Sequence, residues 1–274
     1  MINFNSDLIP KQTSIFGNKN RAFNYGDGVF ETLKVYNSKI VFFEEHYFRL
    51  MASMRILRME IPQNFTLEYV ENEILKTVKS NELLDFARIR MTVFRNEGGL
   101  YTPLTNNVSY VIEVEKLNDK TQDHYEVELF KDFYVNSSFL STLKTTNKIL
   151  NVVASIFASE NDYDSCLLIN EKKNLVEASH GNIFLIFGNE LVTPPIADGC
   201  IKGIVRNKII ELLKKKLNFT VVERTISPFE LQKADELFIT NSIIDIQQVN
   251  KYRKKIFETV ITSEIREILK ESYS

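Results

Sequence analysis

The stretch that decides the fold is Arg21–Leu57, RAFNYGDGVFETLKVYNSKIVFFEEHYFRLMASMRIL. Residues 28–36 are rich in β-branched and aromatic side chains, a turn signal follows at 37–38, and the strand pattern returns at 39–43. This order predicts a β-hairpin. Residues 44–57 then carry apolar side chains at helical spacing, so a helix is expected directly after the hairpin.

The same kind of pattern continues on the C-terminal side of this stretch. A second helix is predicted over 67–80, and strands near 88–94 and 108–114. Together with the hairpin they predict a small N-terminal α/β domain over residues 1–114. The segment EKLNDKTQD at 115–123 is polar and poor in strand formers, so it is the expected linker.

Residues 124–274 predict a second, larger domain. Strands are expected at 166–170, 183–187 and 236–240, a long amphipathic helix at 204–217, and a closing helix at 259–271. The fold class is therefore α+β or α/β in two domains. No internal repeat is found.

Composition excludes several classes of protein. The net charge is −2 over 274 residues, which does not favour a nucleic-acid partner. No apolar run approaches 18 residues, so no membrane span is expected. The two cysteines lack the spacing of metal ligands and the three histidines are far apart, so we expect no metal site, no disulfide framework and a reducing, cytoplasmic location.

Common short motifs such as GxGxxG, Walker A, HExxH and GxSxG are absent, so separate residues must carry the chemistry. Lys144, in LKTTNKILNVVAS, is a candidate nucleophile between an extended segment and a helix. Glu177, in NLVEASHGNIF, ends one strand just before another. Gly203 opens the long helix, whose first amides suit a phosphate. Each candidate alone is weak, and their joint order is what is informative.

That order resembles the class IV aminotransferases, the fold-type IV enzymes that use pyridoxal 5′-phosphate (PLP), with a D-amino acid aminotransferase-like fold. The resemblance runs from about Arg21 to Val249. It is carried by the stretch quoted above and then, in order, by KTTN, VEASHGNIF, LVTPP, GCIKGIVRNKIIE and ADELFIT. Together these segments are highly specific.

The resemblance implies a role for each matching residue. Lys144 would bind PLP as a Schiff base and shuttle the substrate proton, and Glu177 would pair with the pyridine nitrogen. The other implied residues are Arg49, Gly203, Ile204, Val205 and Ser242 at the phosphate, Asn182 as support, and Phe30, Glu31, Arg90 and Arg95 in the substrate pocket. The family also implies a homodimer, in which a partner loop often closes the pocket.

The residues that contact the substrate are the part of the site that the sequence predicts least well. Phe30 and Glu97 count against a D-alanine-type enzyme, because that enzyme has a tyrosine and a histidine there. GDG with Thr32 looks more like 4-amino-4-deoxychorismate lyase, whereas Leu100 replaces an arginine of that lyase's loop. Val205 stands where many members have threonine.

The leading expectation is therefore the lyase, which forms 4-aminobenzoate and pyruvate for folate synthesis. The alternative is a branched-chain-type amino-acid aminotransferase that uses 2-oxoglutarate. Arg90 would then serve a substrate carboxylate. A non-catalytic PLP-binding protein is a minor alternative. In every case the ligand is a small amino compound.

Overall fold

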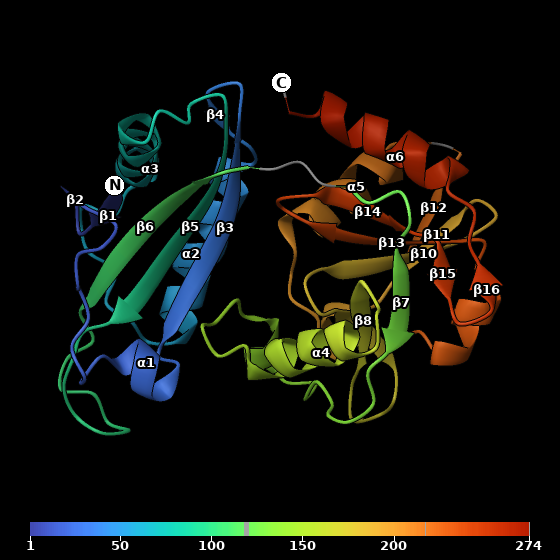
Figure 1. Cartoon of the computed structure of the whole chain (residues 1–274), viewed down its shortest axis with the longest axis horizontal. Helices are drawn as coiled ribbons and strands as arrows, with labels where there is room; N and C mark the ends of the chain where they lie inside the picture. Colours follow the sequence, from blue (N-terminus) through green and yellow to red (C-terminus); the bar gives the residue numbers. More distant parts are fainter. Residues whose placement is uncertain (118–120, 217, 274) are drawn as a thin grey trace. The chain divides into compact units, whose positions relative to one another are not determined.

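The computed structural model describes residues 1–117, 121–216 and 218–273, and divides the chain into two compact units (Figure 1). Unit 1 is Met1–Asn118 with Lys144–Asn147, and unit 2 is Asp119–Leu143 with Lys148–Ser274. The division falls inside the predicted linker 115–123, whose first two residues still belong to a strand and whose residues 118–120 lie outside the described part. The sequence did not predict the return of Lys144–Asn147 to unit 1.

Unit 1 is built on one six-stranded sheet of order β2-β1-β6-β5-β3-β4. All of its pairings are antiparallel. The strands are β1 (Ile2–Phe4), β2 (Asp7–Ile9), β3 (Gly28–Tyr36), β4 (Lys39–Ile40), β5 (Phe86–Arg95) and β6 (Val108–Lys116). The predicted hairpin is thus present as β3 and β4.

One face of this sheet is covered by two helices, α2 (Phe43–Ile56) and α3 (Leu67–Ser80), while the short α1 (Arg21–Tyr25) precedes β3 (Figure 1). Side chains alternate along a strand, so Val29, Leu33 and Val35 of β3 join the helices in the apolar core. The alternate residues of β3, Phe30 and Thr32 among them, therefore face the other side of the sheet.

Unit 2 contains two five-stranded sheets. One has the order β12-β11-β10-β13-β14 and the other β16-β15-β7-β8-β9. The strands are β7 (Glu126–Leu129), β8 (Ser165–Ile169), β9 (Leu175–Ala178), β10 (Asn182–Phe187), β11 (Glu190–Thr193), β12 (Thr220–Glu223), β13 (Glu236–Asn241), β14 (Asp245–Val249), β15 (Lys251–Tyr252) and β16 (Lys255–Ile256).

Three helices pack on these sheets. Helix α4 (Ile149–Glu160) lies on β8, and α5 (Ile204–Lys214) and α6 (Val260–Glu271) lie together on β13 (Figure 1). Helix α5 ends three residues before the predicted Leu217, which is outside the described part. Short 3-10 turns occur at Phe139–Thr142, Ile196–Asp198 and Pro228–Gln232. No helix of the described residues is long and apolar enough to span a membrane.

Candidate active site

The backbone around Lys144 is held in unit 1 by the first residues of β3. The Phe30 N–H donates to the Lys144 carbonyl at 2.9 Å, and the Thr146 N–H donates to the Gly28 carbonyl at 2.9 Å. Val29 and Thr145 form the isolated bridge between these bonds. Residues 144–146 therefore run antiparallel to β3, which fixes the Lys144 side chain to the sheet of unit 1.

Two cationic side chains each contact the ring of Phe30. The Lys144 Nζ lies 4.4 Å from the ring centroid and the Arg90 guanidinium carbon 3.7 Å from it. An aromatic face attracts cations at such distances. Burial lowers the pKa of Arg90 and Glu113 opposes this shift, but an arginine stays charged at any physiological pH. The structure thus brings an amine and a guanidinium to one ring.

Behind the sheet, Glu31 is enclosed by two residues of α2. Arg49 donates from Nε to Glu31 Oε1 at 2.8 Å and from Nη2 to Oε2 at 2.5 Å. The ring of His46 contacts Oε2 through Nδ1 at 2.7 Å. Burial opposes the ionisation of Glu31, but the attraction and hydrogen bonds of Arg49 and His46 lower its pKa to about 2. Glu31 is therefore an ion-pair partner on the helix-covered face.

His46 is a residue that the sequence interpretation missed. Burial lowers its pKa, and the positive charges of Arg49 and Lys144 lower it further against the opposing effect of Glu31. The imidazole is thus neutral at pH 7, and we assign its proton to Nδ1 so that it donates to Glu31. The H-x-x-R spacing on a helix was the available signal, because residues three apart share one face.

Arg95, expected in the substrate pocket, is bound within unit 1 by several acceptors. It donates to Asp27 at 3.0 Å and to Asn106 at 2.6 Å, and also to the backbone carbonyls of Leu57 and Arg58. Its side chain is 7% exposed. These bonds attach the end of β5 to its surroundings, so we assign Arg95 no substrate contact in the proposal below.

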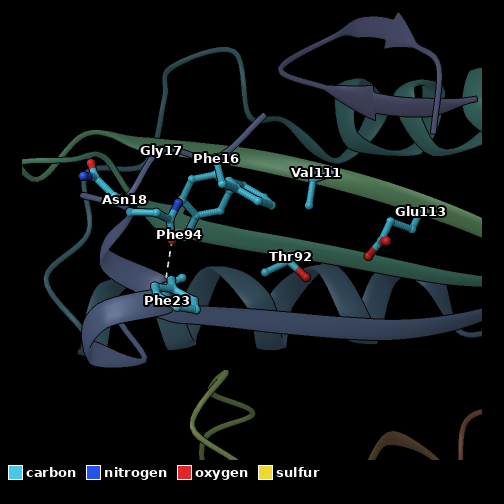
Figure 2. Close-up of a pocket in the computed structure, with 10 residues that line it drawn as sticks. Phe16, Gly17, Asn18, Phe23, Thr92, Phe94, Val111 and Glu113 are labelled. Carbon is cyan, nitrogen blue, oxygen red and sulfur yellow. Dashed lines mark hydrogen bonds between the residues drawn. The ribbon is translucent and has the colours of Figure 1, made fainter. Parts of the chain in front are cut away.

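Unit 1 has a hollow of about 480 Å³ whose lining includes Thr92 and Glu113 (Figure 2). Thr92 lies two residues along β5 from Arg90, and Glu113 is the cross-strand partner of Arg90, so both share its face of the sheet. The rest of the lining is mainly apolar and includes Phe16, Phe23 and Phe94.

In unit 2, Glu177 and Asn182 hold the same backbone segment from two sides. Glu177 is 7% exposed and its Oε2 accepts the Ile201 N–H at 3.0 Å. Asn182 donates from Nδ2 to the Ile201 carbonyl at 2.8 Å. Glu177 lies near the end of β9 and Asn182 is the first residue of β10. The turn that joins these two strands therefore positions both residues.

The segment held in this way leads directly into α5. Gly203 is its N-cap residue, and no side chain of the described residues caps the helix there. A Cβ at Gly203 would lie 2.0 Å from Asn182 Oδ1, so a larger residue there would have to displace the Asn182 side chain. Ile204 and Val205 follow as the first helical residues, both buried. The half-buried Ser242 follows β13.

Each unit therefore contains part of the predicted residue set. Unit 1 has Lys144, Phe30, Arg90, Glu31 and Arg49, and unit 2 has the others. A lysine amine, a buried carboxylate and an open helix N-terminus are the groups that a phosphorylated aldehyde cofactor with a basic ring nitrogen requires.

The profile of the family amino-transferase class IV matches residues 28–252. The chain belongs to this family, whose members are PLP-dependent aminotransferases or lyases, and its cofactor is PLP. The residues described above fit that cofactor, because each kind of group it needs is present.

Individual relatives are mostly named as aminotransferases. The chain is 30% identical to a putative branched-chain-amino-acid aminotransferase of Methanocaldococcus jannaschii over 91% of this chain and 86% of that protein. It superposes on a Thermobaculum terrenum branched-chain aminotransferase in its PLP form with a TM-score of 0.86, 21% identity, and coverage of 99% and 93%. A putative 4-amino-4-deoxychorismate lyase of Legionella pneumophila gives a TM-score of 0.87, 23% identity, and coverage of 95% and 96%. These structural likenesses confirm the expected fold.

Proposed function

We propose that this protein is an amino-acid aminotransferase of the branched-chain type, with 2-oxoglutarate as the amino acceptor. The observation that carries the proposal is the contact of both Lys144 and Arg90 with the ring of Phe30. A guanidinium binds a carboxylate through two parallel hydrogen bonds, and both 2-oxoglutarate and glutamate have a second carboxylate for it. Two curated relatives, from Methanocaldococcus jannaschii and Aquifex aeolicus, are named as a putative and a probable branched-chain-amino-acid aminotransferase, which supports the proposal.

PLP, when bound, supplies a ring that withdraws electrons from the substrate. In the proposal Lys144 would hold this cofactor, and its Nζ, when it is not bonded to the cofactor, would move the proton at the substrate α-carbon. Glu177 holds a proton at the ring nitrogen. Arg49, the first amides of α5 and Ser242 bind the phosphate, and Phe30 orients the Lys144 amine.

Glu31 has a different role in this proposal from the one that the sequence suggested. Its carboxylate accepts two hydrogen bonds from Arg49, and so it orients the guanidinium. The side chain of Arg49 is 12% exposed. A preoriented guanidinium loses less side-chain entropy when it binds a phosphate.

The lyase is the second candidate. It is favoured by Thr32, which is the cross-strand partner of Arg90 in β3 and β5. The likeness to the Legionella protein is 23% in sequence and supports the fold alone. The aminotransferase therefore has the better support, and the sequence-based preference for the lyase is reversed here.

One set of assays separates the candidates. Leucine with 2-oxoglutarate is expected to yield glutamate, and aminodeoxychorismate is expected to yield no pyruvate. Borohydride reduction followed by peptide mapping should place the phosphopyridoxyl group on Lys144. Lys144→Ala should lose this label and reduce the rate by about 10²–10⁴-fold or more. Pyruvate without glutamate would establish the lyase. A protein that carries the phosphopyridoxyl label but is inactive in both assays would establish the non-catalytic alternative.

Arg90 can be tested against a matched residue of the same strand. Arg90→Gln should raise the KM for 2-oxoglutarate by about 10-fold or more, since a bond to a charged group contributes about 1.5–3 kcal/mol. Arg88→Gln should leave KM unchanged, because Arg88 is bound to the exposed Glu115 at 3.1 Å. Equal effects of the two substitutions would remove Arg90 from the substrate site.

A homodimer and a cytoplasmic location remain part of the proposal. Unit 1 exposes Phe23, Leu100, Tyr101 and Leu104, each by more than 75%. The loop that carries the last three is anchored by Arg21, which donates to the Leu100 carbonyl at 2.6 Å. Apolar side chains exposed on an anchored loop favour contact with another protein surface. Light scattering of the purified protein should give the mass of two chains.

A further inference from the structure

Two turns of unit 2 carry residues of the proposed cofactor site. The first, Ala178–Gly181, joins β9 to β10 and so lies between Glu177 and Asn182. The second lies between β13 and β14 and contains Ser242. In the proposed function, the first turn serves the pyridine-nitrogen end of PLP and the second turn its phosphate end.

The side chain of Asn241 bonds to both turns. Its Oδ1 accepts the N–H groups of Ile243 and Ile244 at 2.9 and 3.0 Å, which closes the turn around Ser242. Its Nδ2 donates to the His180 carbonyl at 3.2 Å, in the other turn. One amide side chain is therefore a bridge between the two.

The first turn, Ala178–Gly181, is held in place by hydrogen bonds of the His180 ring. Nε2 lies 3.1 Å from the Tyr125 hydroxyl, and Nδ1 lies 3.1 Å from the Ser165 hydroxyl and 3.2 Å from that of Ser179. Both ring nitrogens thus have partners, which lie directly before β7, on β8 and in the turn itself. Because the His180 ring is held at both nitrogens, the backbone carbonyl of His180 stays in position to accept the hydrogen bond from Asn241.

The first turn also lies directly against β13, the strand that leads into the second turn. A Cβ at Gly181 would lie 2.4 Å from the Thr240 carbonyl oxygen and 2.8 Å from Ile239 Cγ2. The backbone of the first turn is therefore packed against the end of β13, next to Asn241. Close-packed contacts of this kind transmit strain.

We propose that Asn241 is a positioning residue that couples the two ends of the cofactor site in unit 2. Phosphate bound beside Ser242 fixes the Asn241 amide, which fixes the His180 carbonyl and with it the turn between Glu177 and Asn182. The coupling is reciprocal, because each ligand changes the affinity of the other by the same factor. This inference rests on the proposed PLP site but assigns a role that PLP binding alone does not require.

The test uses apoprotein and the two halves of the cofactor as separate probes. Pyridoxal, which lacks the phosphate, is titrated with and without saturating inorganic phosphate, and the ratio of the two Kd values is the coupling factor. In the unchanged protein, phosphate should tighten pyridoxal binding. Asn241→Asp keeps the acceptor for Ile243 and Ile244 but loses the donor to His180, so the coupling factor should fall by about fivefold, the worth of one hydrogen bond.

A second measurement follows the turn itself. Hydrogen exchange of residues 178–181 should slow when inorganic phosphate is added to the unchanged apoprotein, and it should not respond in Asn241→Asp. Asn241→Ser, which cannot reach His180, should behave in the same way if the Asp variant folds poorly. Asn161→Asp is the matched control, because Asn161 donates to the Phe157 carbonyl at 2.8 Å at the exposed end of α4.

The outcomes separate the two proposals. An unchanged coupling factor and an unchanged exchange response in the Asn241 variants, or no response in either protein, would overturn the role of Asn241 while PLP still binds. If the unchanged protein binds neither PLP nor pyridoxal, the proposed function fails and the coupling fails with it. A loss of coupling in Asn161→Asp as well would show a general loss of stability and overturn the inference.

Discussion

Glu31 in unit 1 and Glu177 in unit 2 are both buried carboxylates, but their partners differ in kind. Glu31, 3% exposed, is held by the charged side chain of Arg49 and the ring of His46. Glu177, 7% exposed, accepts a backbone N–H from Ile201. The comparison teaches that a side-chain partner fixes the orientation of another functional group, whereas a backbone partner fixes the path of the chain.

The same difference extends to what each unit can supply. In unit 1 strand alternation places Phe30, with Arg90 and Lys144 against its ring, on one face of the sheet, and helix α2 places Arg49 against Glu31 on the other. In unit 2 the polar residues Glu177 and Asn182 hold the segment that leads into α5. The predicted site residues of unit 1 therefore act through charged side chains, and those of unit 2 through the backbone that they position.

The largest expected effect comes from the charged cluster. Glu31→Gln should lower the free energy of unfolding by about 3–5 kcal/mol, because it removes the negative charge that pairs with the Arg49 guanidinium inside the protein. Urea denaturation followed by circular dichroism measures this loss. Glu115→Gln, at an exposed pair with Arg88, should cause no measurable loss. Equal stability of Glu31→Gln and Glu115→Gln would show that the buried ion pair of Glu31 contributes no more to folding than an exposed one.

Acid should weaken unit 1 through the same carboxylate. The pKa of Glu31 is about 2 in the folded protein, against an ordinary value of 4.5. The folded state thus binds its proton less readily, so this stabilisation is complete above pH 4.5 and falls as the pH decreases toward 2. The loss is about 3 kcal/mol. Denaturation midpoints measured between pH 4.5 and 2 should depend less on pH in Glu31→Gln than in the unchanged protein. If the variant shows the same dependence on pH, groups other than Glu31 cause the loss of stability.

The smallest effect on stability is expected in unit 2. Glu177→Gln should lower the free energy of unfolding by about 1 kcal/mol, because the amide oxygen can still accept the Ile201 N–H. The absorption spectrum of bound PLP should change all the same, since a neutral amide cannot hold a proton at the ring nitrogen. A loss as large as that of Glu31→Gln would show that the charge of Glu177, and not its backbone bond, holds the segment.

Local signals in the sequence predicted the longer elements well. Helix α3 was expected at 67–80 and is found at Leu67–Ser80, because Thr66 accepts the Tyr69 N–H at its start and the apolar positions repeat at helical spacing. Short strands such as β11 were not predicted. Three of the four residues of β11 are buried and its sequence is ELVT, so no alternation of polar and apolar residues marks it.

The candidate site divides in the same way. The order of motifs was sufficient to select Lys144, Glu177 and Gly203. It was not sufficient to place Glu31 opposite Arg49, or to find His46, His180 and Asn241, because the bonds of these residues join elements far apart in sequence.

The amino-acid sequence by itself determined the family, the cofactor and the principal helices and strands, since periodicity, turn residues and motif order are properties of the chain alone. Only the tertiary structure decided which side chains meet: Lys144 and Arg90 over Phe30, Arg49 against Glu31, and Asn241 between two turns. The physical reason is that strand pairing and helix packing choose these partners, and a residue's chemistry depends on what its partner is.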